Sequence, residues 1–241
     1  VVILTPKYDG LSLCIDEETN ESWTRGDGVF GQKSDEHYTY VDNKSTSEYK
    51  KCFTYGEIIM SNSKFNDKYS DEFANPRNLV AGLINTKNPS ESLMDTDYIK
   101  YGIVEKGNTT FKTKYEIIRY LNNSQSVKVP FSLKDISSLT EDYLINLFKE
   151  WSVDYVIDGL IIEINDIKLQ NELGRETSSN NPVWARAFKH ESFEETAETK
   201  VIGLSWNISK YGLLKPVIHI EPVNLDGVVV SNVTGNNARF I

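Results

Sequence analysis

The sequence has few cysteines and no long apolar run. Cys14 and Cys52 are the two cysteines among 241 residues, and neither has a cysteine or histidine neighbour at metal-ligand spacing. Neither a disulfide framework nor a zinc site is therefore indicated. No apolar run approaches the roughly 20 residues of a membrane span, and the apolar opening, residues 1–4, is too short for a signal peptide. We expect a soluble protein of the reducing cytoplasm, cellular or viral in origin, with no membrane partner.

Positive charge is also scarce. The chain carries 26 lysines and arginines against 35 acidic residues, which gives a formal net charge of −9. Because nonspecific nucleic-acid binding depends on cations that displace counterions from phosphates, this charge argues against a simple coat protein for nucleic acid. A nucleic-acid partner would have to meet a local basic surface. From charge alone, an acidic enzyme that acts on small molecules stays an alternative.

The apolar residues that are present predict mixed secondary structure. Residues 1–4 and 11–15 are typical of strands around Asp9-Gly10, as a hairpin or a strand end, which puts Lys7 at a strand edge. Residues 32–51 are polar and predict a surface loop. Further strands are predicted at 52–60, 98–104, 155–164 and 184–188, and helices at 77–84 with Asn75 as cap, at 113–122 and at 141–151. Strands with segregated helices, rather than a regular alternation, favour an α+β fold.

The pattern of apolar residues and glycines changes near residue 201. From there the chain reads as short strands separated by turn glycines, at Gly203, Gly212 and Gly227. This pattern indicates the start of a small all-β barrel. A chain of 241 residues is long enough for one sizeable domain and a small second one. We therefore predict a larger domain over residues 1–197 and a smaller one over residues 198–241.

Lys7 carries the first candidate chemistry. A lysine is a nucleophile only in its deprotonated form, which burial or cationic neighbours favour. The residues before it, 1–4, are all apolar, which permits such burial. Alone, the tetrapeptide Lys7-Tyr8-Asp9-Gly10 is a weak signal, because a lysine beside a turn aspartate is usually a solvated surface pair.

Further motifs follow Lys7 along the chain and strengthen this reading. They are Thr24-Arg25-Gly26-Asp27-Gly28, Gly56-Glu57, Phe73-Ala74-Asn75-Pro76-Arg77-Asn78, Asp158-Gly159-Leu160-Ile161-Ile162 and Trp184-Ala185-Arg186-Ala187-Phe188-Lys189. Together with the Lys7 tetrapeptide, and in this order, they resemble the NAD-dependent DNA ligases. The resemblance implies a nucleotidyltransferase (adenylation) domain with an ATP-grasp-like core of antiparallel sheets and flanking helices. The tail, with Tyr211-Gly212-Leu213-Leu214-Lys215-Pro216-Val217 and Glu221-Pro222-Val223, resembles the start of that family's OB-fold.

The resemblance implies a three-step reaction that seals 5′-phosphate/3′-hydroxyl nicks in DNA, as in repair and replication. Lys7 takes AMP from NAD and forms a lysyl-AMP, AMP passes to the 5′-phosphate, and the 3′-hydroxyl displaces it. Asp9 is expected to act near the 3′-hydroxyl or to help place the metal, and Asp158 to position metal and sugar. Glu57 would hold the ribose, and Lys189 would neutralise the α-phosphate. Mg²⁺ is the expected metal, because it prefers oxygen ligands, but no residue is assigned as its ligand.

Five further residues receive binding roles from the same resemblance. Arg25 and Arg77 would hold phosphates or the nicked strand, with Arg25 also expected among the catalytic and NAD-binding residues. Gly10 is expected at the NAD site, and Tyr101 stands where the family stacks an aromatic ring on adenine. A half-buried strand tyrosine is an equally good reading of Tyr101 from sequence alone. Lys210, like Arg77, is expected to contact nucleic acid.

The sequence departs from the family pattern at five positions. Thr5 replaces a glutamate that contacts adenine, Tyr55 and Asn85 replace arginines, and Glu150 falls near another expected arginine. Glu163 replaces the lysine that ends the Asp-Gly-x-x-x-Lys motif and contacts the phosphate or the leaving nucleotide. Because a lysine-to-glutamate exchange reverses a charge beside a phosphate, Glu163→Lys is expected to raise adenylation.

Two alternatives stay open. One keeps the fold but uses ATP as donor or joins RNA ends. The other is a degenerate nucleotidyltransferase that binds nucleic acid or a partner subunit without catalysis, as the basic residues lost at several positions suggest. The family also places an NMN-binding domain before the lysine and DNA-binding domains after the OB-fold. We expect missing segments or a second subunit to supply them, whether the chain is a fragment or a reduced ligase.

Overall fold

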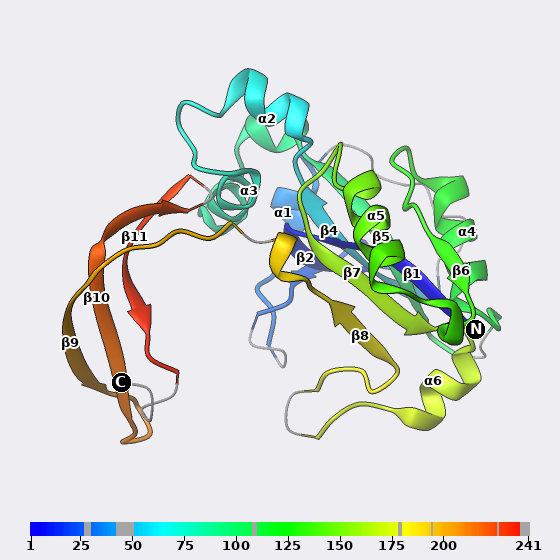
Figure 1. Cartoon of the computed structure of the whole chain (residues 1–241). Coiled ribbons are helices and arrows are strands. Elements are labelled where there is room, and N and C mark those ends of the chain that lie inside the picture. The colour runs from blue at the N-terminus through cyan, green and yellow to red at the C-terminus, as the bar shows by residue number, and fades with distance from the viewer. Residues whose placement is uncertain are drawn as a thin grey trace. The chain divides into compact units, whose positions relative to one another are not determined.

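The computed structural model describes residues 1–26, 30–41, 51–107, 110–177, 180–193, 195–225 and 227–236. The chain divides into two compact units, Val1–Phe193 and Glu194–Ile241 (Figure 1). Each is a unit of packing, so the functional domains 1–197 and 198–241 stay predictions.

The first unit contains two four-stranded antiparallel sheets. One has the order β6-β1-β7-β8 and the other has the order β3-β2-β4-β5. The first sheet consists of β1 (Val2–Tyr8), β6 (Ser132–Lys134), β7 (Ile157–Ile164) and β8 (Ala185–Phe188). The second consists of β2 (Leu11–Asp16), β3 (Ser22–Thr24), β4 (Cys52–Ile59) and β5 (Asp97–Glu105). Together with the helices they confirm the mixed α+β class.

Of the two readings of Asp9-Gly10, the hairpin is wrong and the strand end is confirmed, because β1 ends at Tyr8. β1 pairs with β7 and, over Val2–Leu4, with β6, whereas β2 pairs with β3 and β4 in the other sheet. The chain instead crosses from one sheet to the other at Asp9, whose N–H donates to the carbonyl of Val156 at 3.0 Å. Lys7 consequently lies within β1 and not beyond its end.

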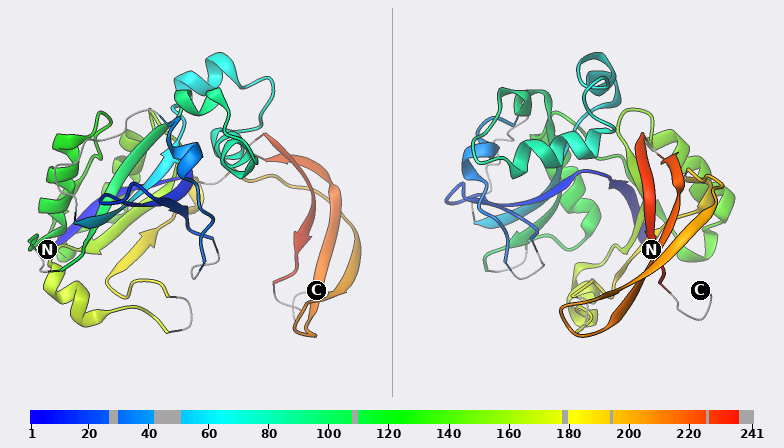
Figure 2. Two further views of the ribbon diagram at one scale, coloured as in Figure 1. Left: turned by 180° about the vertical axis from the view of Figure 1, so that it is seen from behind. Right: turned by 90° about the vertical axis from the view of Figure 1, so that its left-hand side faces the viewer.

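Helices cover the sheets (Figures 1 and 2). Those the structure describes are α1 (Asp35–Tyr38), α2 (Asn62–Lys68), α3 (Pro76–Asn85), α4 (Lys114–Ser124), α5 (Glu141–Trp151) and α6 (Ile167–Leu173), with short 3₁₀ turns at η1 (Glu91–Asp95), η2 (Ile136–Ser138) and η3 (Glu191–Phe193). The longest of them pack on strands: α3 on β4 and β2, α4 on β5, and α5 on β7. The Asn75 side chain caps α3 by accepting from the Asn78 N–H at 2.8 Å, which confirms the predicted cap.

Three helices lie where none was predicted. Residues 32–51, predicted as a surface loop, contain α1, in which His37 is buried. Val41, in the same segment, is also buried. Residues 42–50 lie outside the described residues. In α2 the one buried residue is Phe65, and in α6 it is Gln170. Helices this short bury too few side chains to give an apolar period, so their sequences look like loops.

A buried ion pair links two strands of the second sheet. The Lys100 ammonium in β5 donates to the Glu17 carboxylate just after β2 at 2.6 Å, and the two side chains are 1% and 5% exposed. The Thr54 hydroxyl also donates to Glu17 at 2.7 Å. A charge taken out of water is tolerated only with such partners.

Removing one partner of this pair tests how much the pair contributes to the free energy of unfolding. We expect Lys100→Met to lower the free energy of unfolding by about 3–5 kcal/mol, because Glu17 would stay buried without its cation. Lys168→Met, which removes an exposed lysine that pairs with Glu172, should change it little. Urea unfolding followed by circular dichroism measures both, and equal losses in the two variants would contradict the expectation.

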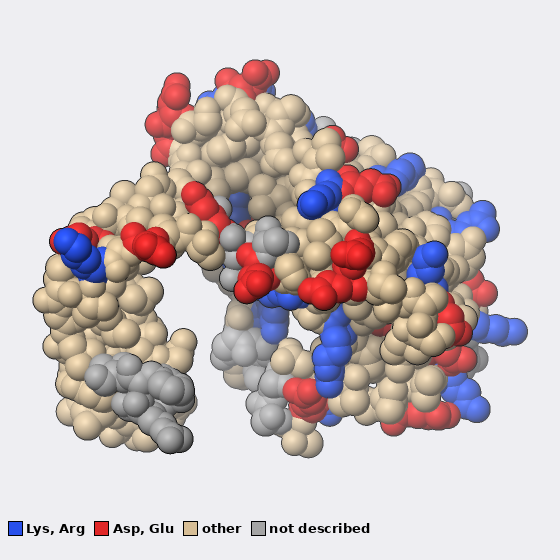
Figure 3. All heavy atoms as spheres, in the orientation of Figure 1, with Lys and Arg blue, Asp and Glu red and all other residues tan. Residues whose placement is uncertain are grey.

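The second unit is a three-stranded antiparallel sheet of order β11-β10-β9. Its strands are β9 (Val201–Ile208), β10 (Leu214–Leu225) and β11 (Val228–Thr234). Large apolar side chains are exposed on it, among them Ile202, Trp206, Ile208 and Leu214. The face of this unit seen in Figure 3 carries few charged side chains. The start of an OB-fold in this unit stays a prediction.

Candidate active site

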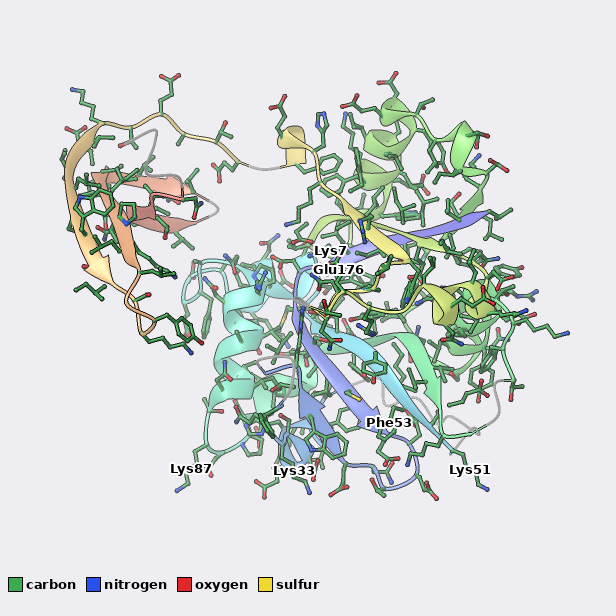
Figure 4. The ribbon with its side chains drawn as sticks, turned by 90° about the horizontal axis from the view of Figure 1, so that it is seen from below. Lys7, Lys33, Lys51, Phe53, Lys87 and Glu176 are labelled. Carbon is green, nitrogen blue, oxygen red and sulfur yellow. The ribbon has the colours of Figure 1, made fainter. Side chains whose placement is uncertain are left out.

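Three charged side chains meet where β1, β7 and β8 run side by side. The Lys7 ammonium donates to both oxygens of Asp158, at 2.6 and 2.8 Å, and the Lys189 ammonium lies 3.0 Å from Asp158 Oδ2. Lys7 belongs to β1, Asp158 to β7, and Lys189 directly follows β8. Figure 4 shows Lys7 inside the first unit, whereas Lys33, Lys51 and Lys87 lie at its periphery. One carboxylate thus holds two lysines from separate strands.

The pKa of Asp158 reflects this position. Burial by itself raises the pKa of the carboxyl, but hydrogen bonds and charge from Lys7 and Lys189 outweigh burial and hold the pKa below its usual value. Asp158 therefore stays ionised around neutral pH and acts as a fixed anchor for both lysines.

Gly159 is the residue that allows this arrangement. Its φ is +155°, and a Cβ at this position would lie 2.4 Å from the carbonyl oxygen of Phe188 on β8. The pairing of β1 with β7 also shifts register between Pro6 and Tyr8, opposite Asp158-Gly159. Glycine is the residue that tolerates such backbone and such close approach, so the Asp-Gly pair is a requirement of the local strand packing.

A second group of site residues lies on the other sheet. Glu57 in β4 accepts a hydrogen bond from the Tyr101 hydroxyl in β5 at 3.2 Å. Burial raises the pKa of Glu57 to about 7, against the opposing effects of the Tyr101 hydrogen bond and the positive charge of Lys7. Burial also raises the pKa of the Tyr101 hydroxyl. Gly10 packs against this strand so closely that a Cβ would lie 2.2 Å from the Ile58 carbonyl oxygen.

Asp9 and Arg77 form a third pair. The Arg77 guanidinium, in the first turn of α3, donates to the Asp9 carboxylate, which follows β1. The charges of Lys7, Arg77 and Asp9 all act on Glu57. The structure therefore brings Lys7, Asp9, Glu57, Arg77 and the residues bonded to them into one neighbourhood.

The structure also describes two further predicted site residues, Arg25 and Lys210. Arg25 is exposed just after β3, and its charge reaches the Tyr101 hydroxyl; Asp27 and Gly28 of its glycine-rich loop lie outside the described residues. Lys210 belongs to the second unit, between β9 and β10, where its ammonium lies 4.8 Å from the Tyr211 ring centre.

Glu163 has a partner that the sequence did not reveal. Its carboxylate lies 3.1 Å from the ammonium of Lys114, in the first turn of α4, and accepts from Gln170 of α6 at 3.3 Å. Glu163 and Lys114 are both buried. A lysine at a helix N-terminus is unfavourable for the helix dipole, and this feature of Lys114 is the one signal from which a carboxylate partner could have been inferred.

The strand register also separates Glu163 from Lys7. Glu163 lies opposite Ile3, four residues before Lys7 on β1, which is about 13 Å along a strand. The other departures lie elsewhere: Thr5 is buried on β1, while Tyr55 on β4 and Asn85 at the end of α3 are exposed. The reversed charge at Glu163 is thus neutralised locally.

The carboxylates at the site already have partners. Among the described residues, no cluster of three or more histidines, cysteines or acids has the geometry of a metal site. Asp158 is held by Lys7 and Lys189, and Asp9 by Arg77. This donor set does not fit an all-protein metal cage. It fits at most an ion that keeps water and takes phosphate oxygens from a substrate, as Mg²⁺ usually does.

Comparison with known proteins places these residues in an adenylation domain. A family model for the NAD-dependent DNA ligase adenylation domain matches residues 1–193. The chain therefore belongs to the family of NAD-dependent DNA ligases, as the ordered motifs predicted.

Relatives from viruses and bacteria match almost the whole chain. "Putative DNA ligase 052L" of Invertebrate iridescent virus 3 is 33% identical over 239 residues, which cover 96% of this chain and 30% of the viral protein. The DNA ligase of Fervidobacterium nodosum is 31% identical over 253 residues, with 98% of this chain and 36% of the relative covered. That of Hydrogenobaculum sp. is 32% identical over 260 residues, with the same two shares. The chain thus spans about a third of the length of these relatives.

The Lys114–Glu163 pair changes the expected effect of Glu163→Lys. Two buried lysines would then face each other, so we expect the single variant to lose about 3–5 kcal/mol of unfolding free energy rather than to gain adenylation. The double variant Lys114→Glu/Glu163→Lys should recover most of the loss, because it restores the pair and puts the acid at the helix N-terminus. Thermal unfolding of the three proteins measures this. A double variant no more stable than the single one would refute the pairing.

The raised pKa of Glu57 predicts a pH effect on stability. The pKa rises from 4.5 to about 7 on folding, so the folded protein favours the neutral acid. Below about pH 4.5 Glu57 is protonated in both the folded and the unfolded chain. Between about pH 4.5 and pH 7 it ionises in the unfolded chain alone, so the stability of the folded chain falls. Above about pH 7 the loss of stability is complete. We expect Glu57→Gln to gain stability relative to the unsubstituted protein between pH 5 and pH 8.

Urea unfolding at these two pH values measures the difference. The control is Glu72→Gln, at an exposed acid, which should show no such gain. A Glu57→Gln variant whose stability follows that of the unsubstituted protein at both pH values would show that Glu57 ionises as easily in the folded chain as in the unfolded one.

Proposed function

We propose that this chain is the adenylating core of a ligase that seals nicks in double-stranded DNA with NAD as AMP donor. The observation that carries the proposal is the grip of Asp158 on Lys7 and Lys189, at 2.6 and 3.0 Å. These ion pairs hold the Lys7 nitrogen, the proposed nucleophile, beside the Lys189 ammonium. A phosphate that binds there would contact both lysines. Phosphoryl-type transfer is accelerated mainly by such positioning and by cations near the phosphate oxygens.

The first step consumes NAD, which is therefore a substrate. After its ammonium loses a proton to solvent, Lys7 Nζ attacks the α-phosphorus. A P–N bond forms, the P–O bond to NMN breaks, and NMN leaves with the bonding pair. Lys189 would neutralise the α-phosphate. Glu57 would hold the ribose, since the burial that raises its pKa leaves a carboxyl in need of hydrogen-bonding partners. Tyr101 orients Glu57 through its hydroxyl and presents its ring to the adenine.

The later steps involve DNA. AMP moves from Lys7 to the 5′-phosphate at the nick, the 3′-hydroxyl attacks that phosphate, and AMP leaves as the phosphodiester forms. Asp9 would act near the 3′-hydroxyl. Arg25, exposed, and Arg77, more than half exposed, would hold strand phosphates. Phosphate contacts of this kind depend on a few well-placed cations, which agrees with an acidic chain.

Further parts of the ligase would lie outside these residues. We assign the second unit to an OB-fold whose Lys210 contacts the DNA, because its three-stranded sheet leaves apolar side chains exposed that a closed barrel would cover. Recognition of the NMN half of NAD and the remaining DNA contacts would come from additional segments or a second subunit. Mg²⁺ would sit at the phosphates with water and at most one or two site carboxylates, and would stabilise charge there.

None of the helices described is long and apolar enough to cross a membrane.

An intact-mass measurement tests the proposal. Incubation with NAD and Mg²⁺ is expected to add the mass of one AMP, and Lys7→Ala should abolish the adduct. Lys7→Arg, which keeps the charge on Asp158 but has no nucleophilic amine, should also abolish it. Lys33→Ala, at an exposed lysine on the periphery, is the matched control and should be adenylated normally.

The donor and the nucleic acid are tested in the same experiment. An adduct from ATP but not from NAD would overturn the assignment of the donor, and transfer of AMP to nicked RNA but not to nicked DNA would overturn that of the substrate. No adduct from either donor, in this chain and in any longer form that includes it, would favour the degenerate nucleotidyltransferase.

A further inference from the structure

A cavity of about 560 Å³ lies away from the residues that meet at Lys7. This volume is within the range of small-molecule sites, about 300–1,000 Å³. Tyr8 lies at the cavity, but Lys7 does not. The cavity is lined by Tyr8, Ser61, Ser63, Val127, Lys128, Pro130, Glu150, Trp151, Val153, Asp154 and Tyr155.

The strand geometry explains this separation. Neighbouring residues of a strand point to opposite faces of their sheet. Lys7 points toward Asp158, whereas Tyr8 packs in the apolar cluster with Leu144 and Leu147 of α5. One strand therefore carries the nucleophile on one face and part of the cavity wall on the other.

Aromatic rings form the inner wall. Tyr8 and Tyr155 meet edge to face, with ring centroids 6.2 Å apart. The Tyr155 hydroxyl donates to the buried Asp97 carboxylate at 2.9 Å, which fixes the ring. Trp151 packs against the same core cluster from the end of α5. Three aromatic residues therefore line one cavity, which favours an aromatic ligand.

The rim of the cavity is acidic. Glu150 and Asp154 are exposed, and neither forms an ion pair with a lysine or arginine that the structure describes. The one cation on the lining, Lys128, already donates to the carbonyl oxygens of Asn122 and Gln125, at the end of α4. The net charge offered to a ligand is therefore negative. Glu150 is also one of the positions where the sequence departs from the arginine expected in the family.

The rim is held in place by the backbone. The Asn62 N–H donates to the Asp154 carbonyl at 2.9 Å, and its side-chain amide donates to the Val153 carbonyl at 3.0 Å. Ser61 and Tyr155 form a β-bridge. These bonds tie the start of α2 to the loop after α5 and fix the backbone at the rim of the cavity.

We propose that this cavity binds a flat aromatic cation, at a site separate from that of Lys7. The ligand would stack on one of the rings of Tyr8, Trp151 and Tyr155, and these aromatic residues would attract its positive charge. Glu150 and Asp154 would face the charge from the rim. A neutral ring would keep the stacking and lose the electrostatic attraction, and an anion would be repelled.

Isothermal titration calorimetry with 1-methylquinolinium tests the proposal, with neutral quinoline as the matched probe. We expect the cation to bind about fivefold more tightly than quinoline, the size of one exposed charge pair. Glu150→Gln/Asp154→Asn should remove that advantage. Asp142→Asn, also on α5 but not on the cavity lining, should keep it.

Two outcomes would overturn the proposal. One is equal binding of the cation and quinoline, or no binding of either. The other is loss of cation binding in Lys7→Ala with no change in Glu150→Gln/Asp154→Asn, because it would place the ligand at the nucleophile. Calorimetry detects binding whether or not Lys7 is adenylated, so failure here is distinct from failure of the proposed ligase activity.

Discussion

The bridge from Asp158 to Lys7 and Lys189 is the constraint on which the rest of the site depends. It requires β1, β7 and the end of β8 to lie side by side, with β7 in the middle. The middle position requires Gly159, because the backbone of β8 leaves no room for a Cβ there. β1 pairs with β7 as far as Tyr8, where the chain leaves the sheet. The crossing at Asp9 and Gly10 then brings the second sheet, with Glu57 and Tyr101, toward the same lysine.

Charge at the site is arranged in pairs, which would let an acidic chain accept phosphates in the proposed reaction. Lys7 and Lys189 share Asp158, and Arg77 holds Asp9. Each cation is therefore fixed before a substrate arrives, which lowers the cost of reorganisation during reaction. A net charge of −9 describes the whole surface and says little about such a site. Away from it, Glu163 and Lys114 follow the same rule, since neither could stay charged and buried without the other.

Local signals in the sequence predicted the elements that have strong periodicity or caps. The apolar spacing predicted α5 at its observed bounds, and Asn75 with Pro76 predicted the start of α3. Features set by distant partners were not predictable in this way. The hairpin at Asp9-Gly10 failed because β1 pairs with the distant strand β7 and β2 pairs with β3 and β4 in the other sheet. The partner of Glu163 was missed because it lies 49 residues earlier in the sequence, on a helix. The grouping of the site residues was predicted by the order of the motifs, whereas their bonds required the structure.

Side chains alternate between the two faces of β1, so its last two residues, Lys7 and Tyr8, have different surroundings. Lys7 faces charged groups that hold and expose a nitrogen, and a change there acts on the chemistry directly. Tyr8 faces apolar packing, so it helps fix the strand that carries Lys7. β1 pairs with β7 as far as Tyr8, which fixes its register, so a ligand against Tyr8 would press on a rigid support. The same rigidity that keeps Lys7 in register with Asp158 therefore makes the opposite face of β1 a defined wall, able to shape a cavity of its own.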